Sequence, residues 1–138
     1  MDEDKAHEIL SWLNKASSDV RAAERLLDDP EPLCNASGFH SQQAAEKVLK
    51  GYLTWRDQLF EKTHSLVALV AKCLPCDPSF AALRDAATTL TPYAVETRYP
   101  GDLAELTEKE AVTALVLARR VWVFFLGRLP AQICDRVS

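Results

Sequence analysis

Apolar residues recur at helical spacing along most of this sequence, and proline-containing stretches separate the segments that show the pattern. In the first segment, from Glu3 to Asp28, the apolar side chains fall within an arc of roughly 100° on a helix. The side chains in this arc are Ile9, Trp12, Leu13, Ala16, Val20, Ala23 and Leu27. The stretch DDPEP (28–32) ends the segment, because the residue before a proline avoids the α-helical region. The pattern predicts a long amphipathic helix with one buried face.

A second helix is predicted from about Ala36 to Trp55, with Asn35 or Ser37 as its cap. Its apolar face covers an arc of about 180°. Four polar residues lie together on the opposite side, namely Gln43, Glu46, Lys47 and Lys50. We expect Glu46 and Lys47 in particular to be solvated.

Three more helices are expected in the second half of the chain. A short one spans Thr63 to Leu74 with Thr63 as its cap, and another opens at Ser79 and is kinked near Pro92. The last spans 107–126: TEKE (107–110) has the capping-box pattern, and Gly127 can stop the helix.

Four long helices and one short helix, joined by short loops, predict an all-α fold: an antiparallel up-down four-helix bundle with one additional short helix. A chain of 138 residues suits one domain, so residues 1–138 are expected to form a single bundle. The predicted core contains Trp12, Val20, Val48, Leu49, Tyr52, Leu83, Val121 and Phe124.

The last helix is apolar on nearly every side, apart from a narrow stripe around Lys109, Thr113 and Arg120. A helix of this kind must be covered on nearly all sides. Either neighbouring helices wrap it within one chain, or a second copy covers part of it. We favour a homodimer, with the interface formed by Leu115, Trp122 and Leu126.

Composition excludes several classes of function. The net charge is −4 and no basic stripe is visible, so long nucleic acid is disfavoured as a partner. The start of the chain is acidic and unlike a secretory signal. The most apolar run, Ala111–Leu126, is interrupted by two arginines and is too short to span a bilayer, so no membrane association is expected and the protein is predicted to be cytoplasmic.

Neither a metal nor a cofactor is expected. Cys73 and Cys76 form the pair CLPC, but the second ligand pair of a zinc site is missing. A glycine-rich phosphate loop cannot be built from the four glycines that the chain contains. The cysteines are better explained as small apolar residues.

The histidines and Arg98 admit two interpretations each. His7 lies on the polar side of the first helix, while His40 and His64 stand near the starts of the second and third. Each is more readily explained as structural than as catalytic. Arg98 either binds the last carbonyls of its helix or binds an anion near the second helix.

Four motifs together resemble the HEPN domain, a nucleotide-binding helical family. They are W-x3-A-x2-D-V-x2-A (12–23), F-H-x-Q-Q-A-A-E-K-x-L-K (39–50), K-T-H-S-L (62–66) and R-Y-P (98–100). The long second-helix motif is the most specific of the four. Their order and spacing resemble the family over most of the chain.

This resemblance implies a helical bundle that is usually dimeric and that works beside a small nucleotidyltransferase partner in toxin–antitoxin-like pairs. It implies nucleotide binding, for which we name His40, Gln43, Lys50, Lys62, His64 and Arg98. The alternative interpretation is that these polar side chains form a solvated face and make capping contacts, without a ligand.

Many members of the family are ribonucleases marked by an Arg followed, after four to six residues, by a His. Here Arg56 and His64 are separated by seven residues, so the usual mark is absent and we lean against catalysis. Two alternatives remain open. One is a metal-independent ribonuclease toxin that uses Arg56 and His64 as a displaced pair. The other is a purely structural interaction module.

Overall fold

The computed structural model describes residues 1–95 and 105–137, and every regular element within these ranges is helical. The long helices are α1 (Glu3–Leu27), α2 (Cys34–Trp55) and α5 (Glu108–Leu126). Shorter elements are α3 (Leu66–Cys73), the 3₁₀ helix η1 (Pro78–Leu83), α4 (Arg84–Leu90), the 3₁₀ helix η2 (Thr91–Ala94) and α6 (Ala131–Cys134). The all-α prediction is confirmed.

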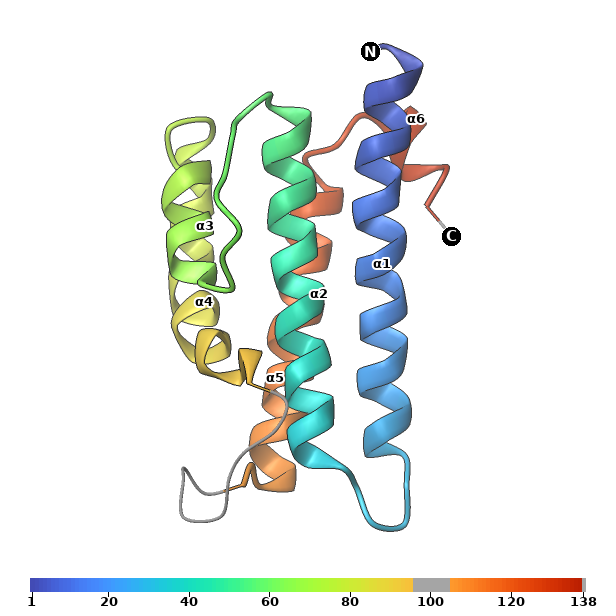
Figure 1. The fold of residues 1–138 in the computed structure, drawn as a ribbon, viewed down its shortest axis with the longest axis vertical. Helices are drawn as coiled ribbons and strands as arrows, with labels where there is room; N and C mark the ends of the chain where they lie inside the picture. Colours follow the sequence, from blue (N-terminus) through green and yellow to red (C-terminus); the bar gives the residue numbers. More distant parts are fainter. Residues whose placement is uncertain (96–104, 138) are drawn as a thin grey trace.

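The helices form a bundle in which α2 lies beside α1 and has α5 behind it (Figure 1). The order α1, α2, α4, α5 alternates in direction, and α3 is the additional short helix (Figure 1). The connection between α2 and α3 runs back along the bundle. It therefore brings residues 56–65 alongside α2.

The helix starts differ from prediction at three places, because the cap is chosen by local backbone geometry. The second helix begins at Cys34 without a side-chain cap: Asn35 Oδ1 accepts from the Leu106 amide, and Ser37 Oγ donates to the Ala23 carbonyl. Ser65 caps α3 in place of Thr63, and Asp77 caps η1 in place of Ser79.

The fourth long helix is a composite of η1, α4 and η2 and not one continuous α-helix. Prolines at the starts of η1 and η2 suit these positions, since a proline has no amide hydrogen to donate. The last helix matches expectation: Thr107 and Glu110 form the capping box, and Gly127 is the C-cap.

The core lies where α1, α2 and α5 meet, with α3 and α4 covering its other side. Five of the expected core residues are buried, namely Val48, Leu49, Tyr52, Leu83 and Val121. The prediction is wrong for the other three, Trp12, Val20 and Phe124, which are half-buried at the edge of the bundle. One face of Phe124 is covered by the guanidinium of Arg128, 3.3 Å from the ring centroid, while Phe80 packs against the ring with centroids 4.9 Å apart.

Among the described residues, no helix has both the length and the apolar character needed to cross a membrane.

Candidate functional site

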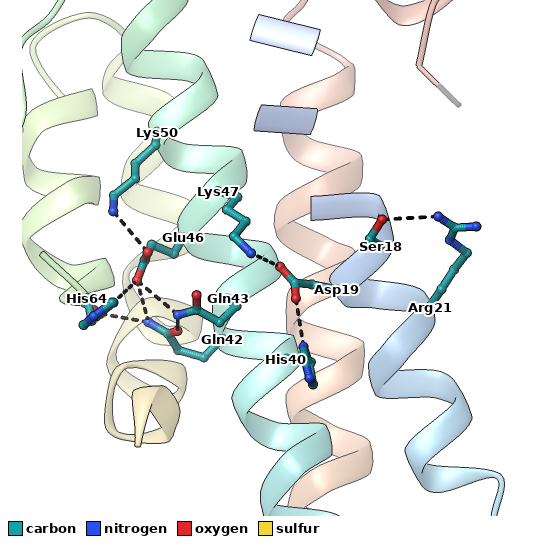
Figure 2. Close-up of polar contacts among 10 residues, drawn as sticks. All are labelled: Ser18, Asp19, Arg21, His40, Gln42, Gln43, Glu46, Lys47, Lys50 and His64. Atoms are coloured by element: carbon teal, nitrogen blue, oxygen red, sulfur yellow. Dashed lines mark hydrogen bonds and ion pairs between the residues drawn. The ribbon is translucent and has the colours of Figure 1, made fainter. Parts of the chain in front are cut away.

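A buried carboxylate, Glu46, organises the polar side chains of α2 that face the α2–α3 connection (Figure 2). Its Oε1 lies 2.8 Å from His64 Nδ1, and its Oε2 lies 3.1 Å from Lys50 Nζ. Two amides complete the group, with Gln42 Nε2 at 3.4 Å and Gln43 Nε2 at 3.5 Å from Oε1. The expectation that Glu46 is solvated is therefore wrong, because the burial of this charge is offset by internal partners.

His64 is held at the surface by two contacts from α2. Gln42 Nε2 donates to the His64 carbonyl at 2.8 Å, while Glu46 accepts at the ring. An ionised carboxylate can only accept, so the hydrogen lies on Nδ1. The His64 side chain is 69% exposed, which leaves Nε2 available to solvent or to a ligand. A buried carboxylate that orients an exposed imidazole is suited to hydrogen bonding and to proton transfer.

Lys50 is enclosed rather than presented to solvent. Its side chain is only 10% exposed, and its ammonium lies 5.9 Å from the Trp12 ring centroid and 6.0 Å from that of Phe60. Together with Glu46, these rings replace the water that the ammonium loses. Lys50 thus balances the buried carboxylate and has little surface left for a ligand.

A second carboxylate, Asp19, joins α1 to the other side of α2 (Figure 2). Its Oδ1 lies 2.8 Å from His40 Nδ1, and its Oδ2 accepts from Lys47 Nζ. Lys47 is accordingly half-buried and paired, and not the solvated residue that the sequence suggested. Asp19 was overlooked as a site residue. The available signal was its position at the edge of the apolar arc of the first helix, beside Trp12.

The structure places four of the six predicted nucleotide-binding residues in these two clusters. Gln43, Lys50 and His64 gather at Glu46, whereas His40 contacts Asp19. Lys62 is exposed in the connection, and Arg98 lies outside the described residues.

Arg56 and His64, the displaced catalytic pair, have separate partners. Arg56 Nη1 donates to the Tyr52 hydroxyl at 3.0 Å, and its guanidinium lies 5.7 Å from the Trp55 ring centroid. His64 is bonded to Glu46. Neither contact joins the two side chains to each other.

The described residues contain no group of three or more His, Cys, Asp or Glu side chains arranged to hold a metal ion. The clusters at Glu46 and Asp19 each combine one carboxylate with lysine and histidine, which suits internal charge pairing.

The proposed interface residues of α5 are partly covered within the chain, and their role in an interface stays a prediction. Leu115 is buried, while Trp122 and Leu126 are half-buried along a groove of about 430 Å³ between α1 and the C-terminal residues. The apolar side chains that α5 exposes are different ones: Val112, Val116 and Val123, at 46%, 49% and 67%.

Comparison with known proteins gives a consistent set of matches. The family model described as the HEPN domain matches residues 9–129. The crystal structure of TT1696 from Thermus thermophilus has a TM-score of 0.72 and 33% identity, and the match covers 88% of this chain and 98% of that one. ST0689, described as an archaeal HEPN homologue, has a TM-score of 0.67 and 25% identity, covering 87% and 96%. No curated protein matches the chain.

Proposed function

The chain belongs to the HEPN domain family, and on that premise we propose that it binds a nucleotide at the edge of α2 where His64 is presented. The observation that carries this proposal is the buried Glu46, which orients an imidazole that is 69% exposed. A side chain held in this way loses little freedom on binding.

The charge at this edge suits one or two phosphates. Lys62, two residues before His64, is exposed and supplies a cation, while the charge of Lys50 is already balanced by Glu46. A long polyanion gains its affinity from many released counterions, which this edge cannot provide. His64 Nε2 would form a hydrogen bond with a phosphate oxygen.

Titration with ATP, AMP and a short RNA tests the proposal. Binding should weaken in His64→Ala and in Lys62→Ala. His7→Ala is the matched control, since His7 is an exposed histidine on α1. If neither nucleotide binds at millimolar concentration, the proposal fails, and the ribonuclease and the structural interaction module are the remaining interpretations.

A ribonuclease is the second candidate, and the Glu46–His64 pair is the observation that favours it. A carboxylate bonded to Nδ1 leaves Nε2 as a proton acceptor or donor, as acid–base catalysis requires. Incubation of RNA with wild type, His64→Ala and Arg56→Ala, with a chelator present, distinguishes the two functions. RNA cleavage that requires His64 would replace the binding proposal with the catalytic one.

For assembly we propose a homodimer that pairs the exposed valine face of α5, made of Val112, Val116 and Val123, with its copy. Glu108 lies at the start of α5 and Arg120 in its second half, while Arg119 is paired with Glu24 and Glu110 with the Thr107 amide. Antiparallel pairing about a two-fold axis would bring opposite charges together. Light scattering should give about twice the chain mass, and Val116→Asp should give a monomer.

For the partner we propose a small nucleotidyltransferase, in a toxin–antitoxin-like pair. The family resemblance supports this proposal. Co-purification with such a protein encoded beside this chain is its test. If the two elute separately at micromolar concentration, the partner proposal is wrong while the nucleotide proposal stands.

A further inference from the structure

A groove of about 480 Å³ lies between α1 and the start of α2, on the side of α2 that faces Asp19 of α1. Its walls are formed by Ser18, Arg21, Ala22, Arg25, Leu26 and His40. Figure 2 shows His40 on this side, directed toward Asp19, while His64 and Glu46 lie on the other side of α2. The groove is thus distinct from the proposed nucleotide edge at His64.

The arginines of this groove are not neutralised within the described part of the chain. Arg21 and Arg25 lie one turn apart on the same face of α1, where like charges repel. Arg25 has no ion pair among the described residues, and the one side-chain contact of Arg21 is a 3.3 Å bond from Nη2 to Ser18 Oγ. Both side chains are exposed and free to turn into the groove.

Most of the acidic groups nearby have other partners, whereas Asp28, one turn after Arg25, has no side-chain partner among the described residues. Asp19 is shared between His40 and Lys47, and Glu24 pairs with Arg119 at 2.6 Å. At the end of α1, Asp29 accepts from the Glu31 amide. No carboxylate is part of the lining, so the charged side chains of the groove itself are those of Arg21 and Arg25, in a chain whose net charge is −4.

We propose that this groove binds the terminal phosphate group of a small phosphate monoester. Arg25 and Arg21 would provide the paired N–H donors that match phosphate oxygens. His40 is oriented by Asp19 through Nδ1, so a doubly protonated His40 ring would donate from Nε2 to a phosphate oxygen. Ser18 Oγ, released by Arg21, donates a further hydrogen bond.

The number of cations sets the class of ligand. Two guanidinium groups and one imidazole match a single dianion, whereas a polynucleotide requires a longer basic track. Ala22 and Leu26 supply apolar wall beside the arginines and can contact the organic part of the ligand.

The three histidines of the chain make the proposal measurable, because each gives its own imidazole signals in an NMR spectrum. Inorganic phosphate, AMP and adenosine are titrated at constant pH and ionic strength, with signals assigned through His7→Ala, His40→Gln and His64→Ala. We expect phosphate and AMP to shift the His40 signals and adenosine to leave them unchanged.

Affinity for AMP, followed at His40, should fall by about tenfold or more in Arg25→Ala, as expected for the loss of a charged hydrogen bond. Arg25→Lys should fall between wild type and Arg25→Ala, since it keeps the charge and loses the paired donors. Arg84→Ala is the matched control, an exposed arginine on α4. Circular dichroism confirms that each variant is folded.

Several outcomes would overturn the inference. One is a shift of His64 alone, which would support the nucleotide edge and exclude the groove. Another is an equal response to adenosine, which would show that phosphate is not recognised. A third is an equal loss of affinity in Arg25→Ala and Arg84→Ala, which would reflect general charge. Movement of His40 alone would support the groove and leave the His64 edge without a ligand.

Discussion

His64 Nδ1 lies 2.8 Å from Glu46 Oε1, and this contact joins the α2–α3 connection to the middle of α2 across 18 positions of sequence. The same carboxylate holds Lys50 through its other oxygen at 3.1 Å. Glu46 therefore has two roles. It balances a lysine that is enclosed between two aromatic rings, and it presents an imidazole at the surface.

Glu46→Gln should destabilise the fold strongly. The substitution keeps the shape of the side chain but leaves the Lys50 ammonium, only 10% exposed, without its counter-charge. Breaking a buried ion pair by removing one partner costs about 3–5 kcal/mol. Urea unfolding followed by circular dichroism measures this loss.

The double substitution Glu46→Leu with Lys50→Met tests the reason for that loss. Replacing both charges removes the unpaired ammonium, so much of the stability should return. If the double variant is as unstable as Glu46→Gln, the cost arises from packing and not from charge.

The helices could be predicted from sequence because their signal is local. A spacing of three and four residues places Val48, Leu49 and Tyr52 on one face, and these residues are buried. The site depends instead on contacts between distant residues. Asp19 and His40 are 21 positions apart, and no local pattern indicates that they meet.

Gly38→Ala should lower stability although alanine is the better helix former. A Cβ at this position would lie 2.4 Å from Leu106 Cδ1. The Leu106 amide donates to Asn35 Oδ1 at 2.8 Å, which keeps that segment close to α2. Where Leu106 cannot rotate away, overpacking of this kind costs about 1–3 kcal/mol, against a gain in helix propensity of about 0.5–1 kcal/mol, and chemical denaturation measures the balance.

Leu106→Ala supplies the control for this steric argument. In the Leu106→Ala background the clashing side chain is absent, so adding Gly38→Ala should leave stability unchanged or raise it. A Gly38→Ala variant that is more stable than wild type with Leu106 in place would mean that the leucine moves aside at no cost.

Helix boundaries were harder to predict than the helices themselves. The sequence DPS offers both Asp77 and Ser79 as caps, and the structure uses Asp77, whose carboxylate accepts from the Ser79 amide at 2.9 Å. Likewise, Ser65 and Thr63 compete at α3, and Ser65 accepts from the Ala68 amide. Both choices satisfy the rule for caps, so the rule alone cannot select one.

Cys73 should resist thiol reagents in the folded protein. Burial raises the pKa of its thiol from 9.0 to about 12, and its side chain has no exposed surface. At pH 8 the thiolate fraction is then about 1,000-fold lower than for an ordinary thiol, and the thiolate is the reactive form. Reaction with a chromogenic disulfide should show one thiol that reacts only in denaturant. Cys73→Ala should remove that thiol, and a rapid native reaction lost in this variant would contradict the burial.

Asp77 should make stability depend on acid pH. Hydrogen bonds from the Ser79 hydroxyl and amide, and then the charge of Arg128, hold the pKa of this carboxyl below its ordinary value of 3.8. The unfolded chain therefore binds a proton at Asp77 at a higher pH than the folded chain does. The stabilisation is complete above the ordinary pKa and is lost as pH falls through the pKa of the folded state.

Asp77→Asn should consequently lower the melting temperature at pH 6, and the difference from wild type should shrink below about pH 4, as linkage requires. Arg128→Gln is the companion variant. It removes one of the smaller contributions to the lowered pKa of Asp77, so it should reproduce only part of the loss in melting temperature. If Asp77→Asn lowers the melting temperature by the same amount at pH 6 and at pH 3, the loss of stability comes from the cap geometry and not from ionisation of Asp77.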